Sequence, residues 1–465
     1  MRDVTLSYVM TPSYTFSGGA VRWRVPALAL TLVGCGSWGR AGTSPAPQPG
    51  ESISQVLDLN AAFRRIGRLT GGAPTPFVAD VAVFAGPGDS SIAVVGVSLV
   101  NQNLSFERDG DVFVARYHIM LSAQPAAGGA PVVLNRDQSV RVSTFQETQR
   151  SEESVLFQEG LTLSPGVWKI AVQIGDPAPG RNSRAEAQYT VPRFGPGSLT
   201  APALAYQVHP RSARSTPISV ILNPRGTIAY GGDSAIAFVE AYALPGPRSV
   251  PVRLVVGRDS TVLVDSLRFA GGREVETAIL RFAPDSLPLG ELHLVLGPPP
   301  DTTVTTALIS FSSNWVVTNF EDMLNLLRYF PPSPALDSLR KASAADRGRL
   351  WQAFWRSSDP NTATGNNEAL DGYFRRVALA NLRFRDEGVL GWRTDRGEVL
   401  IRLGEPDEVF DASPQSEGRL IRWGYTQYQL ALYFVDETGF GRFRLTPSSR
   451  SELERVVALL SRREQ

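Results

Sequence analysis

Short stretches in which every second residue is apolar fill most of the chain from residue 77 to residue 311, and this period of two constrains the fold most strongly. They are rich in Val, Ile and aromatic residues and are divided by Gly, Pro, Asp and Asn, as in β-strands joined by turns. One series lies at 77–84, 91–99, 112–121, 139–145 and 167–174, and another at 218–222, 234–244, 250–256, 260–269, 274–282, 291–297 and 305–311. Because closely spaced Pro and Gly at 191–197 separate the series, we predict two antiparallel β-sandwich domains of Ig-like type.

After Trp315 the apolar residues follow a helical period. Phe320, Met323, Leu324 and Leu327 share one helix face, and a longer stripe runs from Leu370 to Phe384. Strands of a small sheet are then predicted at 398–403, 419–425, 428–435 and 441–445. Ser449 with Glu452 predicts the capping box of a last helix. We therefore expect a small α+β domain at the C-terminal end.

The beginning of the chain carries the features of an export signal. Arg22 and Arg24 precede an apolar run at 25–33, which is too short to span a bilayer but suits a signal peptide. The sequence Leu32-Val33-Gly34-Cys35 resembles the lipobox of bacterial lipoproteins and ends at the single cysteine of the chain. This resemblance implies cleavage before Cys35 and acylation of that residue, and Gly36 after it implies an outer-membrane address facing the periplasm.

The segments on either side of the lipobox complete the predicted layout. Residues 1–20 are polar and do not suit a signal peptide, so we expect the true start near Val21. The predicted parts are a signal region at 1–34, the lipidated cysteine and a Gly/Ser/Pro-rich tether at 35–50, a helix and first sandwich at 51–195, the second sandwich at 198–314, and the α+β domain at 315–465.

Composition removes several classes of function. Lys and Arg number 46 and Asp and Glu 45, so no excess of positive charge favours nucleic acid. With one Cys and 3 His, a zinc site or a thiolate cluster is not expected. The sequence has no P-loop, dinucleotide-binding glycine pattern or EF-hand loop. We expect no cofactor and no metal.

Residues 391–408, GWRTDRGEVLIRLGEPDE, closely resemble the hallmark of the GWxTD-domain proteins, a family of bacterial envelope proteins. Gly391, Trp392, Thr394 and Asp395 match the named letters, and Arg393 occupies the variable position. The resemblance implies export and the three-part layout. It implies no activity, because the family name describes a motif and not a reaction.

The candidate binding or structural residues lie in and after this motif: Gly391, Trp392, Thr394, Asp395, Arg396, Asp407 and Arg422. We interpret the segment 391–397 as an architectural clamp with glycines at both ends. The leading hypothesis is a binding or scaffolding lipoprotein that is anchored in the membrane by its lipid and contacts other envelope proteins or polysaccharide. The alternative is a hydrolase of an envelope polymer that uses carboxylates around Asp395 and Asp407.

Overall fold

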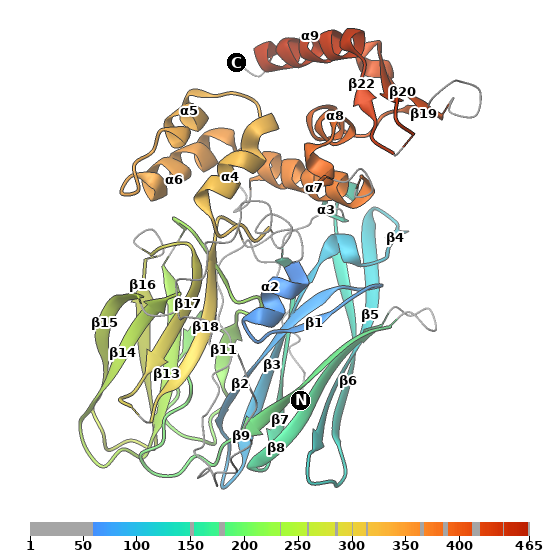
Figure 1. Cartoon of the computed structure of the whole chain (residues 1–465). Helices are drawn as coiled ribbons and strands as arrows, with labels where there is room; N and C mark the ends of the chain where they lie inside the picture. The colour runs from blue at the N-terminus through green and yellow to red at the C-terminus, as the bar shows by residue number, and fades with distance from the viewer. Residues whose placement is uncertain are drawn as a thin grey trace, which may run out of the picture. The chain divides into compact units, whose positions relative to one another are not determined.

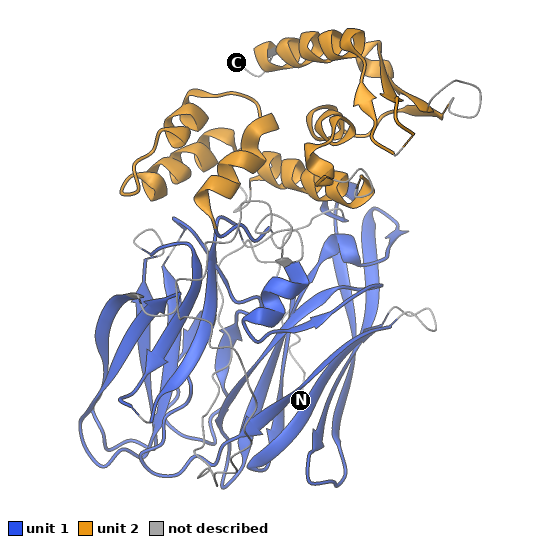
Figure 2. Ribbon diagram, viewed as in Figure 1, with its two compact units in different colours: residues 1–318 blue, residues 319–465 orange. Residues whose placement is uncertain are grey.

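The computed structural model describes residues 59–148, 153–175, 182–232, 234–257, 260–283, 287–299, 301–312, 315–362, 367–384, 389–411, 419–439 and 441–463. The predicted signal region, Cys35 and the tether lie outside these residues. The chain divides into two compact units, unit 1 up to Thr318 and unit 2 from Asn319 (Figure 2). Within the described residues, no helix has both the length and the apolar character needed to cross a membrane.

The first half of unit 1 consists of two sheets that enclose a common core (Figure 1). One sheet has the order β1-β2-β3-β7 and the other β4-β5-β8-β9, with β6 paired to β5. Val95 of the first sheet and Ile119 and Val172 of the second are completely buried in that core. The elements are α2 (Leu59–Arg65), β1 (Leu69–Gly71), β2 (Phe77–Ala85), β3 (Ser91–Val100), η1 (Asn101–Asn103), β4 (Phe106–Asp109), β5 (Val112–Pro125), β6 (Val132–Val142), α3 (Phe145–Thr148), β7 (Glu153–Leu163), β8 (Gly166–Gly175) and β9 (Asn182–Val191).

The second half of unit 1 repeats this arrangement with sheets of order β11-β10-β13-β16 and β12-β18-β17-β14-β15. A second core, which includes Val252 and Leu292, lies between them. Strand β12 pairs with β18 in parallel, so the prediction of purely antiparallel sheets is wrong at this pair. The elements are β10 (Ala203–His209), β11 (Ser219–Leu222), β12 (Thr227–Ala229), β13 (Ala235–Tyr242), β14 (Arg248–Val256), β15 (Ser260–Phe269), β16 (Val275–Phe282), β17 (Gly290–Leu296) and β18 (Thr303–Ser310).

The β2-β3 sheet of the first half packs directly on the β10-β13 sheet of the second half. Phe84 stacks on Phe238 with ring centroids 5.4 Å apart, and Leu222 lies in the same apolar cluster. Gly96 permits this approach, because a Cβ there would lie 3.2 Å from Pro224. The Gln158 side chain accepts a hydrogen bond from the Leu222 amide at 2.8 Å, as a neighbouring strand would. The two halves of unit 1 are therefore joined by a continuous packed interface.

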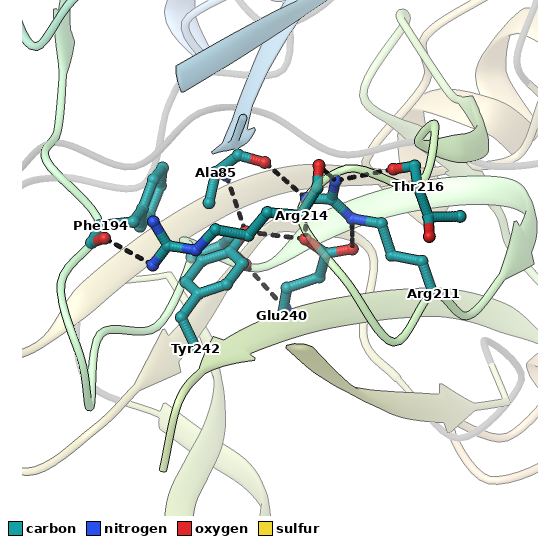
Figure 3. A network of polar contacts seen from close by, with 8 residues as sticks. Ala85, Phe194, Arg211, Arg214, Thr216, Glu240 and Tyr242 are labelled. Atoms are coloured by element: carbon teal, nitrogen blue, oxygen red, sulfur yellow. Dashed lines mark hydrogen bonds and ion pairs between the residues drawn. The ribbon is translucent and has the colours of Figure 1, made fainter. Parts of the chain in front are cut away.

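A buried polar network lies at one end of this interface (Figure 3). Arg211 donates to the Glu240 carboxylate at 2.9 and 2.7 Å and to the Ala85 carbonyl at 2.7 Å. The Tyr242 hydroxyl donates to Glu240 at 2.7 Å and accepts from the Ala85 amide at 2.9 Å. Arg214 adds a bond to the Phe194 carbonyl at 2.6 Å. Because buried charge is tolerated only when it is paired and hydrogen-bonded, these bonds join the end of β2 in the first half to Arg211, Glu240 and Tyr242 in the second half.

Unit 2 begins with helices that pack through aromatic side chains. Side-chain caps start three of them: Asn319 for α4, Ser333 for α5 and Asn367 for α7. The Tyr373 hydroxyl of α7 donates to the Leu326 carbonyl at 2.5 Å. The elements are α4 (Phe320–Leu326), η3 (Leu327–Tyr329), α5 (Pro334–Arg340), α6 (Arg347–Ser358), α7 (Glu368–Arg383), η5 (Gly391–Arg393), α8 (Asp395–Leu403), β19 (Glu408–Asp411), β20 (Arg419–Tyr425), η7 (Thr426–Tyr428), β21 (Leu430–Asp436), β22 (Arg444–Leu445) and α9 (Pro447–Arg463).

The mainly β-sheet character of the chain, with helices towards the C-terminus, confirms the sequence prediction at this level. The predicted strand at 398–403 is wrong, because this segment lies within helix α8. The sheet of unit 2 has the order β19-β20-β21-β22 instead. The predicted cap at Ser449 is also wrong. Helix α9 begins at Pro447, and the Ser449 hydroxyl accepts a hydrogen bond from the Tyr433 amide at 2.9 Å.

Candidate functional site

The motif at 391–397 is a tight turn that leads directly into helix α8. Gly391–Arg393 forms one turn of 3₁₀ helix, and Thr394 is the N-cap of α8. The Thr394 hydroxyl accepts a hydrogen bond from the Gly397 amide at 2.9 Å and donates one to the Gly391 carbonyl at 2.8 Å. A single side chain thus satisfies an N-terminal amide of the helix and fixes the turn that precedes it.

The two glycines of the motif allow backbone segments to touch. A Cβ on Gly391 would lie 2.3 Å from the Ala380 carbonyl oxygen of α7, and one on Gly397 would lie 2.0 Å from the Gly391 carbonyl oxygen. The Gly391 amide donates to the Asn381 side chain of α7 at 3.0 Å. The motif is therefore pressed against α7 more closely than any other residue type would permit.

Trp392 fills the centre of this contact and is completely buried. Its ring lies 6.5 Å from that of Tyr329 in an edge-to-face arrangement, and the Arg393 guanidinium lies 4.9 Å from its centroid. The Nε1 atom of Trp392 has no hydrogen-bond partner among the described groups. Trp392 therefore stabilises the fold of unit 2 through the apolar surface that it buries.

Asp395 connects α8 to the end of the chain. Its Oδ2 accepts a hydrogen bond from the Leu445 amide of β22 at 2.7 Å. Its Oδ1 lies 3.3 Å from Arg450 of α9 and 3.6 Å from Arg444. Because Asp395 is the first residue of α8, its charge also favours the helix dipole. Both carboxylate oxygens are therefore used to hold β22 and α9 against the start of α8.

Glu398, one turn further along α8, extends this network. Arg450 donates to it at 2.7 Å, and Arg402 lies 3.3 Å from its other oxygen. Burial alone lowers the pKa of Arg450, but the hydrogen bond and the attraction of Glu398 and Asp395 outweigh it and raise the pKa above its ordinary value. Burial, followed by the charge of Glu398, raises the pKa of Tyr329. Arg450 therefore stays charged, and its pairing with Glu398 and Asp395 stabilises the contact of α8 with α9.

Arg396 is held by two aromatic rings. Its guanidinium lies 4.7 Å from the Phe384 centroid and 4.4 Å from the Phe443 centroid, within the range of cation–π attraction. The side chain therefore links the end of α7 to the segment before β22. Like its neighbours in the motif, it connects elements that are distant in sequence.

Asp407 lies just before β19 and Arg422 lies in β20, and within the described residues neither shares a partner with the motif residues. Asp407 accepts a hydrogen bond from the Thr426 amide at 2.6 Å, and its own amide donates to the Gly424 carbonyl at 2.9 Å. Arg422 lies 3.5 Å from Glu408 in a solvent-exposed ion pair. The structure thus brings the five motif residues together, while the Asp407 carboxylate closes a turn of the sheet.

Three residues that contribute to the site were not among the predicted ones: Asn381, Glu398 and Arg450. Asn381 carried a signal, because it is a polar residue on the apolar stripe of a helix and such a residue needs a buried partner. Glu398 and Arg450 had no comparable signal. Their role depends on α8 and α9 lying side by side, which the sequence pattern does not reveal.

One face of the β19-β20-β21-β22 sheet of unit 2 carries an exposed row of large side chains. Phe410, Arg422 and Tyr433 are cross-strand neighbours on β19, β20 and β21, on the face opposite the buried Trp423 and Phe434. Phe410 is 55% exposed, Tyr433 is 40% exposed, and the Arg422 side chain is 37% exposed.

Residues 301–439 match the family model described as GWxTD domain. The match ends before β22 and α9, which supply the partners of Asp395. None of the curated proteins compared with the chain matches it.

Three solved structures resemble the chain weakly. A biofilm associated protein BSP domain has 8% identity, covers 55% of this chain and 54% of that one, and gives a TM-score of 0.16. Escherichia coli alpha-2-macroglobulin activated by porcine elastase has 11% identity, with 50% and 22% covered and a TM-score of 0.15. The native conformation of the E. coli protein has 11% identity, with 52% and 16% covered and a TM-score of 0.14. The chain spans about half the length of the first structure and less of the others, and at these TM-scores the likeness supports no conclusion.

Proposed function

Because the chain is a member of the GWxTD-domain proteins, we propose that it is a membrane-anchored envelope lipoprotein with a binding or scaffolding role. In this proposal Cys35 carries the lipid that anchors the chain in the outer membrane, facing the periplasm. The two sandwiches, of Ig-like type, form a rigid support, and unit 2 is presented for contact with other envelope components.

The observation that carries the proposal is the use of the motif's polar groups within unit 2. Asp395, the acidic letter of the motif, has one oxygen bound by the Leu445 amide and the other beside Arg450. A general acid or base must exchange a proton with substrate, and a carboxylate held in this way is occupied by structural partners. Thr394 and Gly397 are likewise bonded to each other. This geometry supports an organising role for the motif.

The hydrolase alternative requires the carboxylates around Asp395 and Asp407 to act on one bond. Their contacts favour the binding role, since Asp407 is bonded to the Thr426 amide and Asp395 to the Leu445 amide. Incubating the purified chain with envelope polymer and measuring the release of fragments would distinguish the hydrolase from the binding protein. Fragment release that is abolished by Asp395→Asn and by Asp407→Asn, in variants that keep the melting temperature of the wild type, would establish the hydrolase.

Crosslinking in the native envelope tests the binding role directly. A photo-crosslinking residue is placed in the full-length, anchored chain at the exposed positions Val264 of unit 1 or Tyr433 of unit 2. We expect a discrete adduct with another envelope component at one of them. The matched control is the same chain with Cys35→Ser, which we expect to leave the membrane and to lose that adduct. Retention of the Cys35→Ser chain in washed membranes, or no adduct at either position, contradicts the proposal.

A further inference from the structure

We propose that the interface between the two halves of unit 1 contains a hydration site, at which ordered water hydrogen-bonds to Asn223, Thr227 and Arg68. Asn223 and Thr227 are completely buried, and Arg68 is only 3% exposed. Both polar atoms of the Asn223 side chain, the Thr227 hydroxyl and the Arg68 Nε have no hydrogen-bond partner among the residues that the structure describes. The site does not depend on the binding role proposed above.

These groups gather around the guanidinium of Arg68, which lies between α2 and β1 in the first half. Its Nη2 lies 3.5 Å from the Asn223 carbonyl oxygen, which belongs to the second half. A Cβ on Gly226, the residue before Thr227, would lie 2.8 Å from the Arg68 Nε. The segment 223–227 is thus packed against Arg68, and the cluster lies where the two halves touch.

A buried ion pair at this place increases the need for further hydrogen bonds. Arg68 is paired with Asp80 of β2, and their side chains are 0% and 8% exposed. Burial is the largest influence on both groups, and it lowers the pKa of Arg68 and raises the pKa of Asp80 in spite of their attraction. A buried pair is well stabilised only when its remaining donors and acceptors are also bonded. The Arg68 Nε therefore needs a partner beyond Asp80.

Water fits this set of groups better than an ion does. The Arg68 Nε and the Asn223 Nδ2 are donors, the Asn223 Oδ1 is an acceptor, and the Thr227 hydroxyl can be either. An anion would leave the acceptor unpaired, and a cation would be repelled by the charge of Arg68. Water both donates and accepts, and a buried water molecule typically forms about three hydrogen bonds to polar groups of this kind.

A crystal structure of the full-length chain, purified in detergent, tests the site directly at a resolution that shows ordered water. We expect at least one water within hydrogen-bond distance of both the Asn223 side chain and either the Thr227 hydroxyl or the Arg68 Nε. Crystals soaked in bromide distinguish an anion, because bromide gives an anomalous signal and water does not. Bromide at the site, an Asn223 side chain bonded to protein groups alone, or no water there overturns the inference.

The sign of a stability change gives an independent test. Thr227→Val keeps the shape of the side chain but removes its hydroxyl. If the hydroxyl is bonded to water, the variant loses a hydrogen bond, and we expect a melting temperature lower by about 2–4 °C. An unbonded buried hydroxyl is unfavourable, so its removal would instead raise the melting temperature. Asn223→Leu is a second variant for which we expect the same direction of change.

The matched control for these variants is Thr305→Val. Thr305 is also completely buried, but its hydroxyl has a protein partner and donates to the Pro202 carbonyl at 2.8 Å. Thr305→Val should therefore lower the melting temperature by a similar amount. If Thr305→Val lowers the melting temperature while Thr227→Val and Asn223→Leu leave it unchanged or raise it, the hydration site is refuted.

Discussion

The guanidinium of Arg211 and the carboxylate of Glu240 form a 2.7 Å ion pair in which the two side chains are only 2% and 4% exposed. Arg211 follows β10 and Glu240 lies in β13, while the same guanidinium reaches the Ala85 carbonyl at the end of β2. The pair therefore links both halves of unit 1. Removing one partner leaves the other charge buried and unpaired, which costs more than the pair itself contributes.

We accordingly expect Arg211→Met and Glu240→Leu each to lower the free energy of unfolding by about 3–5 kcal/mol. The double variant should lose less than the sum, because it leaves neither charge uncompensated. Urea unfolding of the three variants measures this coupling. The exposed pair Arg193 and Asp89 serves as the control and should show a coupling below about 1 kcal/mol. Strictly additive losses at Arg211 and Glu240 would show that they act independently.

The N-cap of α8 gives a second prediction. Thr394→Val keeps the shape of the side chain but removes the oxygen that accepts from the Gly397 amide. We expect a loss of about 0.5–2 kcal/mol in the free energy of unfolding. Thr394→Ser keeps the oxygen and should retain most of the stability. Equal losses for both variants would mean that the methyl group, and not the cap, matters.

Replacing glycine by alanine should lower stability at Gly397 of α8 but raise it at Gly372 of α7. Gly397→Ala would place a Cβ 2.0 Å from the Gly391 carbonyl oxygen, so we expect destabilisation of about 1–3 kcal/mol or more. At Gly372 of α7 a Cβ would meet only the Arg376 side chain at 3.8 Å. Gly372→Ala should therefore raise stability by about 0.5–1 kcal/mol. Thermal melting checks both, and a tolerated Gly397→Ala would refute the close contact.

Trp392 tests whether the motif is primarily architectural. Trp392→Ala removes a completely buried side chain, and we expect a loss of about 3–5 kcal/mol in the free energy of unfolding. Phe410→Ala removes an aromatic side chain that is 55% exposed and should change stability by less than about 0.5 kcal/mol. If Trp392→Ala kept full stability but abolished partner capture, the motif would be a recognition site instead.

The buried carboxyl group of Asp436 should make the free energy of unfolding depend on pH. It is completely buried and accepts hydrogen bonds from the Gly441 amide at 2.7 Å and the Gly439 amide at 3.0 Å. Burial alone raises the pKa of this carboxyl, but the hydrogen bonds, with that from Gly441 first, outweigh burial and hold the pKa below its ordinary value. Since the folded pKa lies below the unfolded value of about 3.9, the stabilisation is complete above that value and is lost as pH falls through the folded pKa.

We therefore expect Asp436→Asn to be less stable than the wild type at neutral pH, with a difference that shrinks as acid protonates the wild-type carboxyl. Urea unfolding at neutral pH and at successively lower pH values measures this. Asp337→Asn, at an exposed carboxylate beside Arg340, is the control and should differ little from the wild type at any pH. A difference at Asp436 that grows towards acid would contradict the sign of the shift.

Local sequence patterns were sufficient to predict the positions of most strands of unit 1. The alternation at 77–84, 91–99 and 250–256 corresponds to β2, β3 and β14, because each strand turns alternate residues towards a core. Strands β7 and β9 carry many polar residues and did not stand out. Strand β12 has only three residues, and its parallel partner β18 lies about 80 positions away, so no local pattern could indicate the pair.

Helix α8 shows where local pattern was misleading. Val399, Leu400 and Leu403 are buried at helical spacing, but with Ile401 they also form a short, nearly continuous apolar run, which periodicity alone does not distinguish from a buried strand. The β-branched residues of this run then favoured a strand. The better signal was the start of the helix, where the Thr394 cap is followed by Asp395 and Glu398 in the first turn.

The sequence by itself determined that this chain is β-rich with a helical C-terminal part, and that its 391–397 segment contains the residue types of a tight, capped turn. Periodicity and side-chain chemistry are local properties, and they can be read along the chain. Only the tertiary structure decided that Asp395 is bonded to Leu445, that Arg211 reaches Ala85, and that Phe410, Arg422 and Tyr433 share one face. These relationships join residues that are distant in sequence, and packing and strand register alone bring them together.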